Sequence, residues 1–373
     1  MLDKDTKFLE ESFKKYYFEH FDLIHTHTNP ERREFGYQKF NFGMNRHISI
    51  KSDKELHLLL MTNIPSDVYC SNATYLFPNL PMAEKDWQGA DLIFDVDAKD
   101  LNLPCRVNHV CKKCTTCKNV FLQNDQCPDC KSTKYETSSV LCPDCISGAK
   151  NEIKKLISIL TGDLGIKKES IQVYFSGNEG FHVYVLESNY EKLDSRQRAE
   201  IVDYILFKGA MPETFGAKKS DFSKSVFSDL DEKGWLGRVS KQIFGSKSNK
   251  PKLSKQLISE GYFSFKKKLE DLQKILGAQI DPNVTIDVHR IFRLAGTINS
   301  KSGLSKIPIY DLEKFNPGND ACFMGDDRIT VLADCPVEFK LKNKKFGPYK
   351  KEQVSVPKYA AVYMICKGYA TLS

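Results

Sequence analysis

Long apolar runs are absent from this sequence. No stretch of its 373 residues approaches the roughly 20 apolar residues that a membrane-spanning helix needs, so we expect no transmembrane helix. Residues 1–21 are dense in charge and have no apolar centre, which is untypical of a secretory signal peptide. Internal repeats and long low-complexity tracts are also missing. These absences favour a cytoplasmic or nucleoid-associated protein, and the length indicates roughly two or three domains.

Cysteine is not scarce, but its distribution argues against a disulfide framework. Eight of the 12 cysteines lie between Cys105 and Cys145, in a chain expected to stay in a reducing compartment. Charge is nearly balanced, with 55 Lys and Arg against 48 Asp and Glu. This small positive excess favours a polyanionic partner without identifying one.

An apolar run ends in two carboxylates, Asp95 and Asp97. Side chains at i and i+2 of a strand point to the same face, so both carboxylates would project together from the end of a buried strand. A solvated turn is the simple interpretation of one such pair. The alternative is a platform for Mg²⁺ or Mn²⁺, which prefer oxygen ligands and share them with substrate phosphates. The motifs downstream favour the metal.

The cysteine-rich segment 103–147 predicts a zinc-binding module. Cys-x-x-Cys pairs separated by short polar loops are typical of closed, structural Zn²⁺ sites, whereas free thiols give no reason for that spacing. We expect two four-ligand groups: Cys114, Cys117, Cys127 and Cys130 in one, and Cys142, Cys145 and Cys105 with either His109 or Cys111 in the other. Because Cys111 and Cys114 also form a valid pair, the number of ions and the partition stay open.

The spacing of apolar residues predicts helices at two places. Residues 8–21 and 153–160 repeat large apolar side chains at the period of an amphipathic helix. Residues 193–276 are prone to helix and dense in Lys and Arg, which predicts a basic helical subdomain. Most of these charges suit a solvated surface, and a minority suit contact with a nucleic-acid backbone.

Residues 171–186 read as two strands joined by a glycine-containing turn. Gly177 and Gly180 allow backbone N–H groups to approach an anion, and Ser176 and His182 add donors at the two ends. A phosphate cradle is one interpretation. A common β-hairpin with a structural histidine is the other.

Residues 279–293 bring two further carboxylates, Asp281 and Asp287, followed by the cations Arg290 and Arg293. Carboxylates that hold metal, beside cations that accept phosphate charge, are the parts that phosphoryl and nucleotidyl transfer require. This segment therefore adds to the metal interpretation of the first carboxylate pair.

Taken in order, these motifs resemble the catalytic small subunit of archaeal and eukaryotic DNA primases. The carboxylate pair after a strand, the Cys/His segment, the Ser-Gly-x-x-Gly-x-His hairpin and the Asp-x-x-Val-Thr block all match, and four ordered motifs are far more specific than one. The match runs over most of the chain, and the length is closer to archaeal members. It implies a mixed α/β (α+β) fold with a discontinuous catalytic core at 1–192 and 277–373, the zinc module at 103–147 and the helical subdomain at 193–276.

The resemblance also assigns residues. Asp95 and Asp97 match the metal-binding pair of the family, and the third carboxylate falls on Asp281, which alone stands in the family relation to Val284. Asp287 is the rival for that place. The nucleotide-binding positions that the resemblance implies are Arg46, Ser176, Gly177, His182 and Arg293.

Two positions depart from the family pattern. Glu179 stands where Arg is common, which removes a cation from near the phosphates and suggests a carboxylate there instead. Asn299 stands where the late motif often ends in His. Both change the expected nucleotide contacts and leave the three-carboxylate centre intact. The cysteine segment is richer than the usual single site of the family, consistent with an inserted second zinc knuckle.

The activity implied by the resemblance is template-directed synthesis of short RNA primers, with DNA primers as an open alternative, on single-stranded DNA. Two Mg²⁺ or Mn²⁺ ions held by the three carboxylates would activate a 3′-hydroxyl and steady the leaving pyrophosphate. The implied partners are NTPs or dNTPs, the template, and a large primase subunit with an iron–sulfur domain. An archaeal protein would be cytoplasmic and nucleoid-associated, and a eukaryotic one nuclear.

Two other functions compete with this one. A stand-alone primase-polymerase in repair or translesion synthesis would use the same three carboxylates without needing a large subunit. A non-catalytic zinc-ribbon protein would bind nucleic acid without incorporating nucleotides, but it leaves the carboxylates and the hairpin unexplained.

Overall fold

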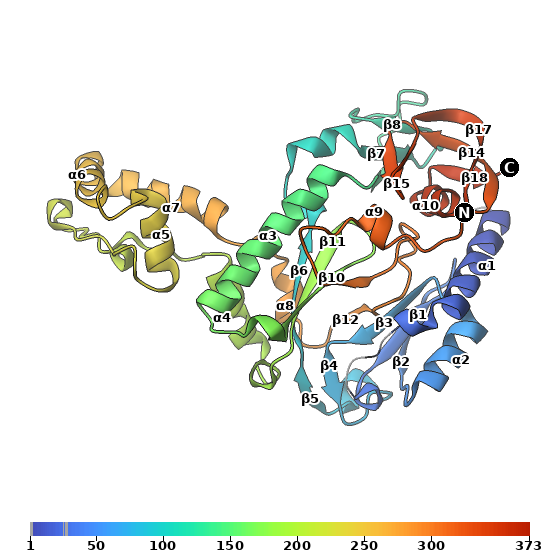
Figure 1. Cartoon of the computed structure of the whole chain (residues 1–373), viewed down its shortest axis with the longest axis horizontal. Coiled ribbons are helices and arrows are strands. Elements are labelled where there is room, and N and C mark those ends of the chain that lie inside the picture. The colour runs from blue at the N-terminus through green and yellow to red at the C-terminus, as the bar shows by residue number, and fades with distance from the viewer. Residues whose placement is uncertain (1–2, 25, 27–28) are drawn as a thin grey trace.

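A computed structural model describes residues 3–24, 26 and 29–373 and shows a mixed α+β protein (Figure 1). All strand pairings within these residues are antiparallel. The mixed fold class expected from the sequence is therefore confirmed. Among the described helices, none is both long enough and apolar enough to cross a membrane.

Two four-stranded sheets form the centre of the molecule, with the strand orders β13-β10-β11-β6 and β12-β3-β1-β2. The first sheet, called here the catalytic sheet, consists of β6 (Leu92–Asp97), β10 (Ile171–Phe175), β11 (Gly180–Val185) and β13 (Ile307–Ile309). The second consists of β1 (Phe35–Gln38), β2 (Met44–Ile48), β3 (Asp67–Ser71) and β12 (Ile291–Arg293). The hairpin expected at 171–186 is thus confirmed as β10 and β11.

The catalytic sheet is covered on both faces, which explains the unbroken apolar run that precedes Asp95. Phe94 and Val96 of β6 join the main core, whereas Ile93 belongs to a separate buried cluster that includes Tyr184 of β11. A strand that is buried on both faces has apolar side chains on both, so its sequence is continuously apolar and does not alternate with polar residues. Its first polar side chains then appear where the strand leaves the core.

The two predicted helices are present and are longer than their apolar stripes. The helix expected within 8–21 is α1 (Asp3–Glu19), and the one expected within 153–160 is α3 (Pro143–Gly162). Proline at the first helical position of α3 fits the start of a helix, where its missing N–H leaves no bond unmade. The apolar side chains of both helices enter the main core, and α2 (Asp53–Asn63) packs beside α1.

The basic region divides into one helix that belongs to the main body and a lobe that does not. Val202 and Ile205 of α4 (Ser195–Ile205) lie in the main core. Residues 207–276, called here the helical lobe, surround an apolar cluster of their own and stand away from the sheets (Figure 1). The lobe contains α5 (Gly234–Phe244), α6 (Lys250–Glu260) and α7 (Tyr262–Leu276). After it, the Ala278 N–H donates to the Ile205 carbonyl at 3.1 Å.

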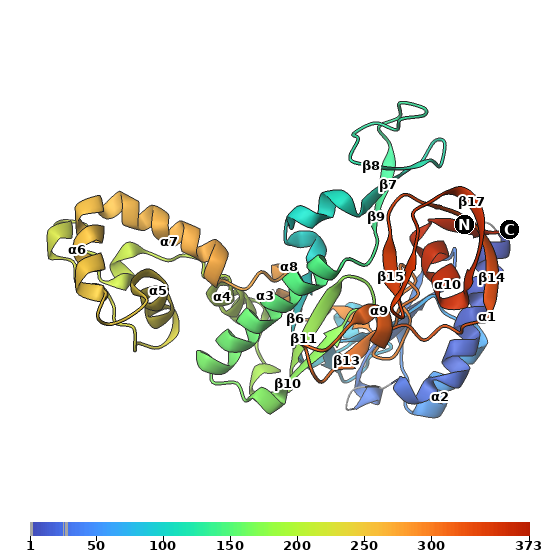
Figure 2. The same ribbon diagram turned by 45° about the horizontal axis from the view of Figure 1, so that its top comes forward.

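The cysteine-rich module carries a three-stranded sheet with the order β8-β7-β9, which projects from the body (Figure 2). Its strands are β7 (Val110–Cys114), β8 (Val120–Leu122) and β9 (Tyr135–Ser139). The remaining elements are β4 (Ala73–Tyr75), β5 (Trp87–Ala90), α8 (Pro282–Ile286), α9 (Pro317–Asp320), β14 (Arg328–Cys335), β15 (Phe339–Leu341), β16 (Lys344–Phe346), β17 (Tyr349–Pro357), α10 (Lys358–Lys367) and β18 (Ala370–Leu372).

Candidate active site and metal centres

Asp95, Asp97 and Asp281 meet at the end of β6. The backbone N–H of Asp281 donates to the carbonyl of Asp95 at 2.9 Å, which brings the start of α8 beside the strand. The Asp281 carboxylate then caps α8 by accepting the N–H of Asn283 at 2.9 Å. Further along α8, the Thr285 hydroxyl donates to the carbonyl of Ile93. These bonds fix the third carboxylate against the first two.

The charge at this end of β6 is poorly compensated by the protein. Burial, together with the negative charges of Asp97 and Asp281, raises the pKa of Asp95 to about 8, while Lys99 opposes them. Lys99 reaches the Asp97 carboxylate at 2.6 Å. Among the described residues, the buried Oδ1 of Asp95 has no hydrogen-bond partner. An orphaned oxygen beside like charges fits a divalent cation, because hard oxygen ligands are what such ions take.

Asp287, the rival third carboxylate, lies at the other end of α8. Its Oδ1 accepts the N–H of His289 at 2.9 Å. Its negative charge acts on Tyr75: the pKa of Tyr75 is raised chiefly by burial and then by nearby carboxylates that include Asp287. The structure therefore brings Asp281, and not this residue, beside Asp95.

His182 faces Asp95 across the pairing of β11 with β6, and its Nε2 lies 3.4 Å from Asp95 Oδ1. Burial holds the pKa of His182 well below its usual range, and the cations Lys306 and Arg293 lower it further. The imidazole is therefore neutral at neutral pH. Its Nδ1 is buried and has no hydrogen-bond partner within the described residues.

The turn between β10 and β11, residues 176–180, is called here the hairpin turn. The Gly180 N–H donates to Ser176 Oγ at 3.2 Å, and the Ser176 N–H donates to the Gly180 carbonyl at 2.9 Å. Gly177 has a φ of +89°, in the region that favours glycine, and a Cβ there would lie 2.9 Å from Asn299 Cβ. Asn299 donates to the Ser176 carbonyl at 3.3 Å and so supports the turn from outside.

The two arginines assigned by resemblance are held in ion pairs. Arg293 is partly buried, and its guanidinium lies 2.6 Å from the Asp67 carboxylate and donates to the Ile298 carbonyl. Arg46 lies on β2, in the other sheet, and makes two hydrogen bonds to the buried Glu34. The charge of Arg293 acts on His182, whereas Arg46 belongs to a cluster with Glu34 and Lys85.

Glu179 does not leave its carboxylate free beside the hairpin turn, because cations of neighbouring elements pair with it. Its side chain is buried and turns toward Arg106 in the cysteine-rich module and Lys367 in α10, at 3.2 and 3.9 Å. The Ser139 hydroxyl also donates to it. The departure from the family pattern is thus a link to the neighbouring module, which no local sequence pattern could reveal.

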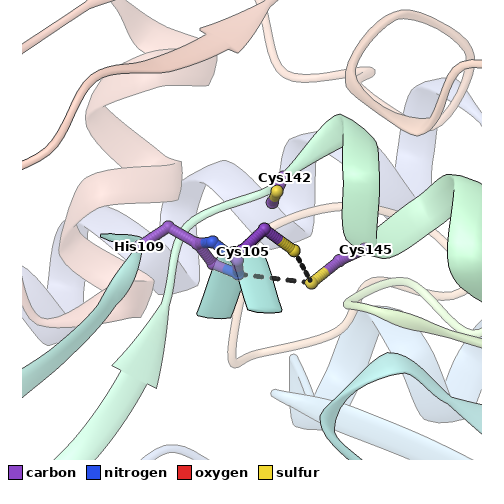
Figure 3. A group of neighbouring side chains, drawn as sticks. All are labelled: Cys105, His109, Cys142 and Cys145. Carbon is purple, nitrogen blue, oxygen red and sulfur yellow. Dashed lines mark hydrogen bonds between the residues drawn. The ribbon is translucent and has the colours of Figure 1, made fainter. Parts of the chain in front are cut away.

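Two groups of ligand atoms gather in the cysteine-rich module, and within each group all the atoms lie within 4.8 Å of one another. The inner group lies where α3 begins (Figure 3), and the outer group lies at the end of β7 and in the loops that follow β7 and β8. The outer group is Cys114, Cys117, Cys127 and Cys130, and the inner group is Cys105, His109, Cys142 and Cys145. Of the two alternatives for the inner group, the structure brings in His109.

Cys111 belongs to neither group. It points from the start of β7 into the main core, where it lies against Tyr369. Side chains alternate along a strand, so Cys111 and Cys114 at its two ends face opposite ways. The expectation that Cys111 is a metal ligand is therefore not supported by the position of its side chain.

The geometry of both groups fits a tetrahedral ion such as Zn²⁺. Sulfur atoms lie 3.4 to 3.6 Å apart in the pairs 117/127, 114/130 and 105/145, close to the spacing of about 3.8 Å that zinc–sulfur bonds of about 2.3 Å give. In the outer group, the backbone N–H groups of Cys117 and Thr116 lower the pKa of Cys114 to about 6. The thiolate is the form of cysteine that binds metal. These backbone N–H groups therefore favour the metal-binding form of Cys114.

Two buried lysines near these sites are not among the site residues assigned from the sequence. Lys306 donates to the Tyr184 hydroxyl and to the Arg293 carbonyl at 2.9 and 2.8 Å, and burial lowers its pKa to about 7. Lys367 donates to Asn178 of the hairpin turn at 2.7 Å. A lysine within an apolar stretch is the only local signal that either gives, and it does not specify a partner.

Comparisons with known proteins show the family to which the chain belongs. A family model described as DNA primase small subunit matches residues 125–310. A protein of Nitrosopumilus maritimus named DNA primase small subunit PriS is 59% identical over 373 residues, which is 100% of each chain. Proteins of the same name from Cenarchaeum symbiosum and Archaeoglobus fulgidus are 51% and 30% identical, covering 100% and 98% of both chains. The chain therefore belongs to the DNA primase small subunit family.

Proposed function

We propose that this small primase subunit joins nucleotides on a single-stranded DNA template by two-metal nucleotidyl transfer. The observation that carries the proposal is the buried Oδ1 of Asp95, which lacks a hydrogen-bond partner among the described residues beside Asp97 and Asp281. Three carboxylates in one place, with so little internal compensation, are costly unless cations occupy the site.

Asp95, Asp97 and Asp281 are the residues that would hold Mg²⁺ or Mn²⁺. The bound ions would lower the pKa of the attacking 3′-hydroxyl and stabilise the charge on the leaving pyrophosphate. The protein keeps the carboxylates in place through the pairing of β6 with β11 and the cap of α8. Lys99 accompanies Asp97 at the open side and balances part of its charge.

The hairpin turn would bind the triphosphate. Ser176 supplies a hydroxyl and the turn supplies backbone N–H groups, while the neutral His182 supplies an N–H donor beside the metal site. A neutral imidazole donates a hydrogen bond without adding a charge next to the bound cations. The 3′-oxygen then bonds to the α-phosphorus as the bond to the pyrophosphate oxygen breaks.

Zn²⁺ in the inner and outer groups would be structural, because four protein ligands leave no position open for a substrate. We also propose a large subunit that carries an iron–sulfur domain as the partner, and NTPs or dNTPs as substrates. The matched relatives are archaeal, which favours the nucleoid-associated location in the cytoplasm over the nuclear one.

Primer synthesis on single-stranded template tests the proposal. Wild type and Asp95→Asn would be compared with labelled nucleotides and Mg²⁺ or Mn²⁺, with and without a large subunit. Unprimed products that disappear in the variant are the expected result. Extension of supplied primers only would favour a stand-alone repair polymerase. Template binding without any incorporation would overturn the enzymatic assignment.

A further inference from the structure

Glu179 joins the hairpin turn to the base of the cysteine-rich module. Its Oε2 lies 3.2 Å from Arg106 Nη1, and its Oε1 accepts a hydrogen bond from the Ser139 hydroxyl. Arg106 lies between Cys105 and His109 in the sequence, and its Nη1 is 4.0 Å from Cys145 Sγ. One guanidinium thus contacts the inner group on one side and the turn on the other.

The link is buried, so its charges depend on one another. The Glu179 residue is 8% exposed, and Lys367 from α10 approaches the same carboxylate at 3.9 Å while donating to Asn178. A buried carboxylate that loses one of its cations keeps the cost of desolvation without the full compensation. The position of Arg106 is therefore coupled to the position of the turn through this carboxylate.

The hairpin turn also borders the carboxylates of the proposed catalytic site. Residue 180, next in sequence, pairs with Asp97 and has no room for a side chain, because a Cβ there would collide with Asp97 Oδ1. The Ala98 N–H also donates to the Glu179 carbonyl at 3.4 Å. A shift of the turn at 179 must therefore be shared by β6 at Asp97.

We propose that Glu179 is a positioning residue that couples metal in the inner group to nucleotide binding at the hairpin turn. Arg106 contacts Cys145 of the inner group and forms an ion pair with Glu179. Through this ion pair, Glu179 keeps the hairpin turn in the conformation that binds phosphate. The identity of the ligand as a nucleoside triphosphate rests on the proposed function. Within the described residues, no hydrogen bond or ion pair joins the cysteines of the outer group to Arg106 or Glu179.

The coupling is reciprocal by thermodynamic necessity. Metal in the inner group tightens nucleotide binding, and bound nucleotide tightens metal binding in the inner group by the same factor. Coupling between sites typically amounts to about 5- to 150-fold in affinity. We expect a factor at the low end of that range, about 5-fold, because Lys367 and Asn299 also hold the turn.

The first experiment uses Glu179→Gln in the full chain. Glutamine keeps an acceptor for Ser139 and removes the charge that pairs with Arg106. We expect nucleotide affinity to fall about 5-fold and KM to rise accordingly, with kcat changed less. Lys112→Met, which breaks the ion pair of Lys112 with Asp125 in the outer part of the module, is the matched control and should leave KM unchanged.

Arg106→Gln and the double variant with Glu179→Gln complete a cycle. If the two residues act through one contact, the double variant weakens nucleotide binding no more than either single variant. Additive losses would show that each residue acts separately and would overturn the coupling. A folded Glu179→Gln protein with unchanged KM would overturn it as well.

The second experiment needs neither turnover nor a variant. Co²⁺ replaces the metal in the wild-type protein, and a chelator competes for it at equilibrium while absorption distinguishes the Cys₃His group from the Cys₄ group. A non-hydrolysable nucleoside triphosphate should raise the metal affinity of the inner group about 5-fold and leave the outer group unchanged. Equal metal affinity with and without a nucleotide that demonstrably binds would overturn the proposal.

The two proposals fail differently. A protein that makes no primers but shows this metal–nucleotide coupling loses the proposed function and keeps the role of Glu179. A protein that makes primers with no coupling and an unaltered Glu179→Gln KM keeps the function and loses the role of Glu179.

Discussion

Asp97 and Gly180 face each other across β6 and β11 with no space for a side chain between them. A Cβ at residue 180 would collide with Asp97 Oδ1 and approach the Val96 carbonyl to 3.0 Å. Glycine is therefore required at this position because a carboxylate of the metal site occupies the volume that any other residue would fill.

Gly180→Ala should displace Asp97 and lower activity on the order of 100-fold, the loss that a misplacement of about 1 Å produces at a reacting centre. Primer synthesis by the purified variant measures this. Gly43→Ala is the control, because a Cβ there meets nothing within 4 Å and its φ is unexceptional. Comparable activity of the two variants would show that Asp97 tolerates the movement.

Asp281→Asn should lower nucleotide incorporation by at least about 100-fold, because it removes a ligand that stabilises transition-state charge. Asp287→Asn changes the neighbouring carboxylate, whose Oδ1 accepts the His289 N–H, and should retain most of the activity. Steady-state incorporation measures both, and circular dichroism verifies their folding. An inactive Asp287→Asn beside an active Asp281→Asn would reverse the assignment of the third ligand.

Metal analysis should find two Zn²⁺ per chain, one in each group. Cys127→Ser should remove one ion with little effect on the main unfolding transition, because Cys114 and Cys127 pack in a small cluster of their own with Phe121. Cys145→Ser should also remove one ion and lower the unfolding midpoint on the order of 5 °C, because Cys145 lies in the main core. Equal midpoints for the two variants would contradict this distinction.

Lys306 should make stability rise with pH above neutrality. Burial lowers its pKa to about 7 in the folded protein from the 10.5 of an exposed lysine, so the unfolded chain binds more protons between these values. The free energy of unfolding should therefore increase with pH across this window, by at most about 1.4 kcal/mol per pH unit. Below pH 7 both states are protonated and the dependence ends.

The measurement is urea unfolding of wild type and Lys306→Met from pH 6 to 10.5, expressed as the difference between the two proteins. The other lysines and the cysteines titrate in both proteins, so their contributions cancel in the difference between the two free energies of unfolding. A difference that stays constant with pH would mean that Lys306 is protonated in the folded protein through this range.

The hairpin and the first carboxylate pair could be predicted because their signals are local. Alternating apolar residues with a glycine turn define β10 and β11, and the apolar run that ends at Asp95 defines β6. The choice between Asp281 and Asp287 came from family resemblance and not from periodicity, since both flank α8. The structure places the chosen residue beside Asp95 through a backbone hydrogen bond.

The contacts that could not be predicted are those between distant segments. Glu179 and Arg106 are 73 residues apart, and the same carboxylate meets Lys367 from α10. Whether His109 or Cys111 completes the inner group depends on which face of β7 meets the core, which spacing alone leaves open. Arg46 and Arg293 carry the right charge, but their ion pairs with Glu34 and Asp67 are set by tertiary packing.

The hydrogen bond from the Ala278 N–H to the Ile205 carbonyl shows that the two ends of the helical lobe lie side by side on the main body. The chain leaves the body and rejoins it at neighbouring residues, so a short linker can bridge the gap at a small loop-closure cost. The lobe keeps its own apolar cluster, and α4 keeps its packing in the body. Lobes of different size or charge can thus be exchanged at this junction without rebuilding the catalytic sheet.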